Sequence, residues 1–146
     1  MLTKTFYLLA ASLLLISGCT HTPTTAKHSE NLSFMDTDVF DKNLSSSMSA
    51  DTETISIAIT GDVSINQIPN RLGNWLSAVV DKQGQVEVEP KTRSLGLAAI
   101  FGLLPAAYQY LKKEFLYGDA EDYNATIFYD RDTGLVNKVV FTKRAK

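Results

Sequence analysis

The side chains able to do nucleophilic or acid–base chemistry are few in this sequence, and the usual combinations are missing. The chain has a single cysteine, Cys19, and two histidines, His21 and His28. Beyond residue 32 it has neither residue type, which excludes histidine-based general acids and bases and the Ser-His and Cys-His nucleophiles from that part. Two histidines seven residues apart in a polar segment also form a poor metal site. We therefore predict no metal and no cofactor.

Carboxylate pairs are the remaining source of acid–base chemistry. Glu87 and Glu89 alternate along a predicted strand and point to solvent, while Asp119 and Asp122 lie in an acidic loop. Neither pair has a sequence neighbour that would tune it for catalysis. No motif frames a serine–lysine pair, and no glycine-rich loop carries the lysine that binds phosphate. We therefore predict that the protein is not an enzyme.

The letters DRDTG, which begin at Asp130, contain part of the pattern of a calcium-binding loop. Asp130, Asp132 and Gly134 match its acidic and glycine positions, but no glutamate follows at the required distance. The flanking runs are apolar and rich in β-branched and aromatic residues, which is typical of strands. We therefore expect a β-hairpin, with Asp130 opening the turn and Gly134 at a positive φ.

The position of Cys19 gives this residue a different chemical role. It follows a positive charge at Lys4, an apolar core over 6–16 and two small residues, which is the plan of an export signal. The apolar core is too short to span a bilayer, which needs about twenty residues. The letters ISGC over 16–19 resemble the lipobox of bacterial lipoproteins, in which an aliphatic residue and two small residues precede a cysteine.

This resemblance implies a lipid anchor. Residues 1–18 would be removed as a signal peptide, and Cys19 would become the lipidated first residue of the mature chain. Each buried methylene adds about 0.8 kcal/mol, so two or three acyl chains hold a small domain at a membrane. In the sorting rule of Gram-negative lipoproteins, an aspartate after the cysteine retains the protein at the inner membrane. Thr20 occupies that position, which favours the outer membrane with the domain in the periplasm.

Composition predicts a single soluble domain behind this anchor. Residues 19–32 are polar apart from Cys19, Ala26 and Leu32 and are expected to form a flexible tether, and 33–146 to form one small α/β domain. Removal of Lys4 with the signal leaves 13 basic against 16 acidic side chains, a net charge near −3. A nucleic-acid partner is not expected, because such proteins present a strongly basic face.

Hydrophobic periodicity places the secondary structure. Phe40, Leu44 and Met48 recur every four residues and predict a short helix, and ISIAIT over 55–60 predicts a strand. A second helix is expected over 67–80, where apolar residues including Trp75 form one stripe and polar residues the other. The remaining predicted elements are a strand at 86–89, a helix over 95–116 and the two strands of the hairpin.

The run Leu95 to Leu111 is almost entirely apolar, and Ala98, Gly102 and Ala106 are spaced by four within it. On a helix these residues would form a smooth stripe that another backbone can approach closely. Three alternatives remain: a core helix across the sheet, a face that meets a partner or a lipid surface, and a true membrane span.

We therefore predict an α/β (α+β) two-layer sandwich. A four-stranded mixed or antiparallel sheet carries helices on one face, in the order α-β-α-β-α-β-β. The predicted function is that of a noncatalytic envelope lipoprotein that binds an envelope protein or a second copy of itself, through a face comprising Ala98, Gly102, Ala106 and Trp75. The alternative is a small module that binds an apolar ligand or lipid between Trp75 and the 95–111 segment. A cell-wall hydrolase is a distant third.

Overall fold

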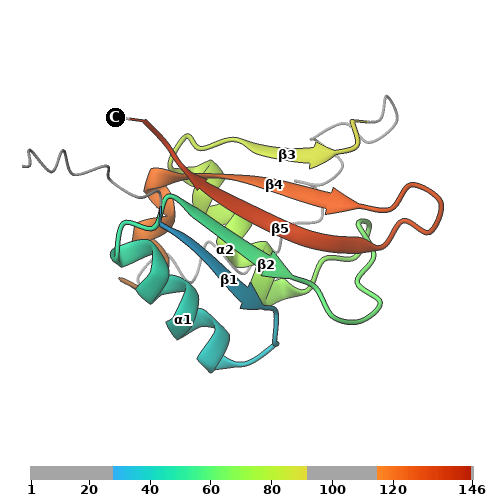
Figure 1. Cartoon of the computed structure of the whole chain (residues 1–146), viewed down its shortest axis with the longest axis horizontal. Coiled ribbons are helices and arrows are strands. Elements are labelled where there is room, and N and C mark those ends of the chain that lie inside the picture. The colour runs from blue at the N-terminus through green and yellow to red at the C-terminus, as the bar shows by residue number, and fades with distance from the viewer. Residues whose placement is uncertain (1–27, 92–114, 146) are drawn as a thin grey trace, which may run out of the picture.

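The computed structural model describes residues 28–91 and 115–145, and these form a mixed five-stranded sheet with helices on one face (Figure 1). The elements in chain order are β1 (Ser29–Ser33), α1 (Asp38–Ser49), β2 (Thr54–Ala58), α2 (Asn70–Asp81), β3 (Val86–Glu89), the 3-10 helix η1 (Phe115–Asp122), β4 (Tyr123–Tyr129) and β5 (Val136–Lys143). The strands lie in the order β1-β2-β5-β4-β3. β1 is parallel to β2, β3 is parallel to β4, and β5 is antiparallel to both of its neighbours.

The predicted fold class is confirmed, but the predicted strand number and element order are wrong. The sheet has a fifth strand, β1, before the first helix. Its sequence, SENLS, has no alternating apolar pattern, and its side chains are exposed or half-buried. It forms because its backbone pairs with β2 and because Leu32 packs against the core beside Ile57. The predicted tether over 19–32 therefore overlaps the sheet at 29–32.

The core lies between the sheet and the helices. Alternate residues of the strands point into it and are fully buried, as the hydrophobic alternation of 55–60 predicts for Ile55 and Ile57. The predicted apolar stripe of α2 is buried as well, and so are Asn74 and Ser77 of its polar side, whereas Asp81 is exposed. Ser77 donates its hydroxyl to the carbonyl of Gly73 at 2.8 Å. The predicted helix over 95–116 falls outside the described residues except for its last two, which begin η1.

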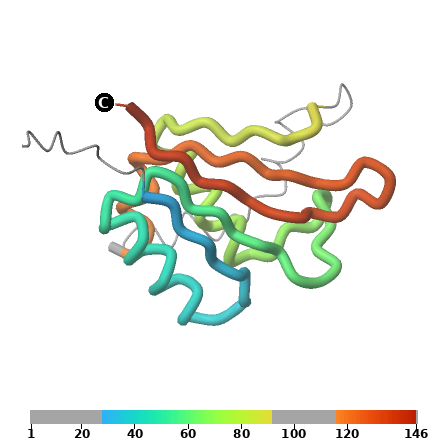
Figure 2. The backbone as a smooth tube through the Cα atoms, in the orientation of Figure 1, coloured from blue at the N-terminus to red at the C-terminus, as the bar shows by residue number. Residues whose placement is uncertain are grey.

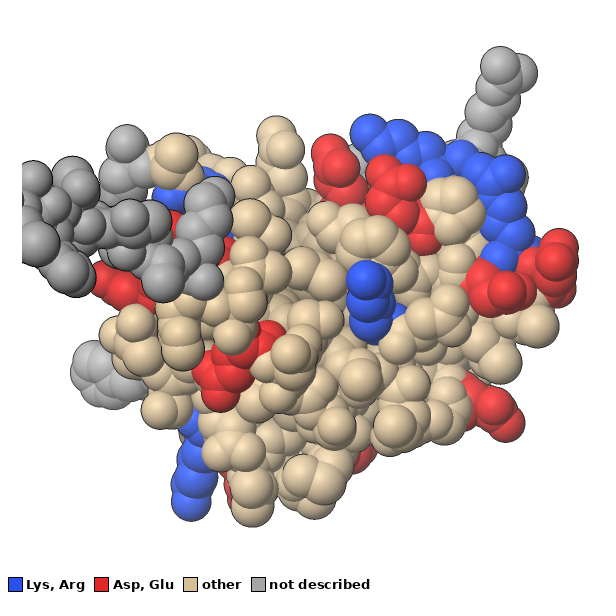
Figure 3. Space-filling view, viewed as in Figure 1, with Lys and Arg blue, Asp and Glu red and all other residues tan. Residues whose placement is uncertain are grey.

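The other face of the sheet carries no helix among the described residues and faces solvent. In Figure 3 this face is mostly uncharged, and charged side chains gather at its rim. Lys138 lies on it, with Nζ 4.5 Å from the ring centroid of Phe128. The wet face that Glu87 and Glu89 predict is therefore present, since both residues lie opposite the buried Val86 and Val88.

The hairpin between β4 and β5 forms as predicted. Gly134 has a φ of 72° and donates its amide to the carbonyl of Asp130. The Asp130 carboxylate accepts hydrogen bonds from the amides of Asp132 and Thr133 and from the Thr133 hydroxyl. The Thr133 backbone hydrogen bond is the largest influence that holds the pKa of Asp130 below its usual value. The backbone trace in Figure 2 shows this turn at one end of the sheet, with the C-terminus at the other.

Candidate functional site

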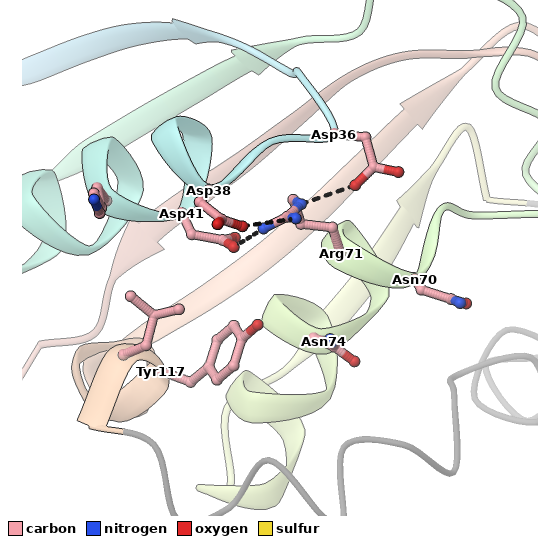
Figure 4. A pocket seen from close by; sticks show the side chains of 9 residues that line it. Asp36, Asp38, Asp41, Asn70, Arg71, Asn74 and Tyr117 are labelled. Atoms are coloured by element: carbon pink, nitrogen blue, oxygen red, sulfur yellow. Dashed lines mark hydrogen bonds and ion pairs between the residues drawn. The ribbon is translucent and has the colours of Figure 1, made fainter.

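A polar hollow of about 550 Å³ lies where the start of α1, the start of α2 and η1 meet (Figure 4). Two acidic residues precede or begin α1, and the first turn of α2 faces them. The residues that line the hollow are Asp36, Asp38, Asp41, Lys42, Asn70, Arg71, Asn74, Leu116 and Tyr117. It thus combines charged, amide and aromatic groups from three elements.

Arg71 is the centre of this arrangement. Its Nε donates to Asp36 Oδ1 at 2.8 Å, its Nη2 to Asp38 Oδ1 at 3.1 Å, and its Nη1 to Asp41 Oδ2. All three carboxylates come from the segment that leads into α1 or from its first turn, so this one guanidinium links α1 to α2. The hydrogen bond to Asp36 is the largest influence that raises the pKa of Arg71, against the effect of burial. Arg71 therefore stays charged throughout the pH range of the folded protein.

Asp41 differs from the other two carboxylates because it is buried. Its side chain is 6% exposed, compared with 68% for Asp36 and 87% for Asp38. Its second oxygen, Oδ1, accepts a hydrogen bond of 2.9 Å from the indole Nε1 of Trp75. A buried carboxylate is stable only when its oxygens are paired, and here Arg71 and Trp75 each occupy one.

Trp75, the one predicted partner or ligand residue within the described part of the chain, lies in the core beneath this hollow. It is fully buried, and its ring packs edge-to-face on Tyr117 with centroids 4.7 Å apart. Tyr117 itself lines the hollow. The other predicted site residues, Cys19, Ala98, Gly102 and Ala106, lie outside the described residues.

The remaining polar groups of the hollow face it from α1 and α2. Lys42 adds a second positive charge, so three carboxylates stand against two cations. Asn74 is 8% exposed, and its Oδ1 has no hydrogen-bond partner among the residues that the structure describes. All three carboxylates are hydrogen-bonded to Arg71, and these bonds hold α1 against α2. Asp36 and Asp38 are also exposed, so they can accept further hydrogen bonds from solvent or a ligand.

The predicted carboxylate pairs are not brought together with this hollow. Glu87 lies on the open face, with one carboxylate oxygen 3.9 Å from Lys91 Nζ. Asp119 lies in η1, where it accepts a hydrogen bond from the Ser49 hydroxyl. Within 28–91 and 115–145, no three His, Cys, Asp or Glu side chains are placed to hold a metal ion. In the same residues, no helix is long and apolar enough to cross a membrane.

The sequence pattern alone does not predict the Arg71 cluster. The three aspartates are close in sequence, but Arg71 lies 30 residues after Asp41, and only the fold brings them together. The one local feature that could have pointed to this cluster is the group of aspartates at the start of a predicted helix. By itself, such a group indicates only a favourable helix start. Comparisons with protein-family models, with curated proteins and with solved structures found no match.

Proposed function

We propose that the protein is a noncatalytic lipoprotein of the bacterial envelope, anchored through Cys19 to the periplasmic face of the outer membrane, where it binds a partner protein. The observation that carries this proposal is the ISGC sequence at 16–19, followed ten residues after Cys19 by the first strand of a folded domain at Ser29. Ten residues span at most about 35 Å. The folded domain would therefore stay close to the membrane surface.

The geometry of the polar hollow supports a noncatalytic role. Arg71 is hydrogen-bonded to three carboxylates, and Asp41 is also hydrogen-bonded to Trp75. These groups satisfy one another and fix α1 against α2. The alternative of an apolar-ligand module rests on the 95–111 segment and stays a prediction.

The lipid anchor is tested by metabolic labelling. The full chain is expressed in a Gram-negative host with an alkyne-bearing palmitate, and its incorporation is compared between the wild type and Cys19→Ser. We expect label in the wild type and none in the variant, with the wild type in the outer-membrane fraction. Thr20→Asp is the matched control, because it should keep the label and move the protein to the inner membrane. An unlabelled wild type would overturn the proposal.

The partner role is tested separately with the labelled protein. In-cell crosslinking should give a discrete adduct in the wild type, and Gly102→Leu should lose it while keeping the palmitate label. The reason is that a bulky side chain would disrupt the predicted smooth face at Ala98, Gly102 and Ala106. An adduct pattern unchanged in Gly102→Leu would count against this face as the contact.

A further inference from the structure

The outer edge of the sheet at β1 presents a row of backbone groups that no other described strand pairs with. His28 and Phe34 bond to β2, through Thr54 N to His28 O at 3.4 Å and Phe34 N to Ala58 O at 2.8 Å. The backbone groups of successive residues in a strand point to alternate sides. The even-numbered residues therefore pair with β2, and the amides and carbonyls of 29, 31 and 33 point away from the sheet.

These outward groups are accessible. Ser29, Asn31 and Ser33 are all exposed, and their outward amides and carbonyls have no hydrogen-bond partner among the described residues. An exposed edge of this kind is a template for another strand, and proteins commonly block it with charges, proline or a bulge. The opposite edge strand, β3, carries Glu87 and Glu89. β1 has only Glu30 and contains neither lysine nor proline.

Exposed apolar side chains follow β1 closely in the chain. Met35, two residues after β1, is 48% exposed, and Val39 in the first turn of α1 is 56% exposed. They are two of the three large hydrophobic side chains exposed in the described part of the chain. Backbone groups give a strand its affinity, and neighbouring apolar surface can contact its alternate side chains.

We propose that the β1 edge binds an extended segment of the partner protein, which adds a sixth strand to the sheet beside β1. This inference rests on the proposed function for the partner's location in the envelope. In Figure 1, α1 lies alongside β1 at this border of the molecule. If a second copy paired edge to edge with β1, its own α1 would lie beside the α1 of the first copy and compete with it for the same space. A single extended strand brings no helix and therefore avoids this conflict. The partner segment carries apolar side chains at alternate positions, on the side that faces Val39.

The test starts from a random ten-residue peptide library displayed on phage and selected against the full lipidated chain in detergent micelles. A selected peptide is then synthesised in two N-methylated forms, each methylated at alternate residues. Strand addition uses only every second peptide amide, so methylation of one set should weaken binding about tenfold or more, and methylation of the other set should not. This comparison changes only the peptide and leaves the fold of the protein untouched.

Two variants at one position provide the matching test on the protein. Asn31→Pro removes an outward amide, and Asn31→Ala keeps that amide while removing the side chain. We expect Asn31→Ala to bind the peptide as the wild type does and Asn31→Pro to bind at least about tenfold more weakly, with circular dichroism confirming its fold. Hydrogen exchange should show the amides of 29, 31 and 33 protected only when peptide is present.

Several results would overturn the inference: a library without binders, equal binding of both methylated forms, or protection of these amides without peptide. The last result would mean that a second copy or another segment of this chain already occupies the edge. The palmitate experiment is independent of these outcomes. If the chain takes up the palmitate label but its β1 edge binds no peptide, only the proposed strand addition is wrong. If the chain binds peptide but takes up no label, only the proposed membrane location is wrong.

Discussion

Asp41 shows how one buried carboxylate can organise two helices. It lies in the first turns of α1, yet its partners, Arg71 and Trp75, both belong to α2. The pairing is costly to break from either side, because the group left behind stays buried without a partner. Asp36 and Asp38 contact the same guanidinium from solvent, where such pairs contribute little.

This difference predicts unequal effects of two substitutions. Asp41→Ala should lower the free energy of unfolding by about 3 kcal/mol, because it leaves the Trp75 indole and part of Arg71 without an acceptor. Asp38→Ala is the control and should change it by about 0.5 kcal/mol or less. Urea denaturation followed by tryptophan fluorescence measures both, since Trp75 is the only tryptophan. Similar losses in the two variants would show that Asp41 is not the essential partner.

Tyr123 makes stability depend on pH above 10. Burial raises the pKa of its phenol to about 12 from 10.0, and its hydroxyl donates to the Thr52 carbonyl at 2.6 Å. Below pH 10 both states keep the proton. Between pH 10 and 12 the unfolded state loses it first and therefore binds fewer protons, so stability falls as pH rises, by about 2 kcal/mol in total.

Tyr123→Phe tests this effect. The variant should be about 1 kcal/mol less stable than the wild type at neutral pH, because the hydrogen bond to Thr52 is lost. The difference should shrink as the pH rises above 10, vanish at about pH 11 and reverse in sign by about pH 12, since only the wild type loses about 2 kcal/mol through this phenol. Thermal or urea unfolding at several pH values measures it. A difference that stayed constant to pH 12 would contradict the assignment.

At the scale of elements, the end of α2 depends on a glycine. A Cβ at Gly84 would lie 2.4 Å from the Tyr123 carbonyl oxygen and 2.6 Å from Val79 Cγ1. Gly84→Ala should therefore destabilise the fold by about 1 to 3 kcal/mol, because the chain must move away from β4. Gly118→Ala in η1 is the control, since its Cβ would meet nothing within 4 Å. Equal denaturation midpoints for the two variants would show that this contact relaxes easily.

The elements that the sequence predicts well are those whose signals are local. The apolar stripe of α2, the alternation of β2 and the Asp130–Gly134 turn each depend on residues within a few positions of one another. β1 carries no such signal, because a polar five-residue edge strand is specified by its pairing with β2. The order of strands depends in the same way on contacts distant in sequence. The Arg71 cluster is a further example, since a local pattern gives its aspartates but not their partner.

At the scale of the whole molecule, the sheet has a protected centre and a weaker edge. β5 pairs with β2 on one side and β4 on the other, and Val139 and Phe141 are fully buried. Within the described sheet, β1 pairs only with β2, over five residues, and contributes little to the core. Local opening is easiest where few buried contacts must be broken, so β1 should separate from the sheet before the centre unfolds.

Native-state hydrogen exchange at increasing urea tests this order. The amides of Val139 and Phe141 should exchange only through global unfolding, with a strong dependence on urea. Those of Glu30 and Leu32, which point to β2, should exchange faster and with a weak dependence on urea. Identical exchange free energies for the two strands would mean that the sheet opens as one unit. If Cys19 is lipidated, tension on the anchor acts first on β1, because β1 is the first described strand after Cys19. A partner strand that pairs only with β1 would then be released when β1 opens.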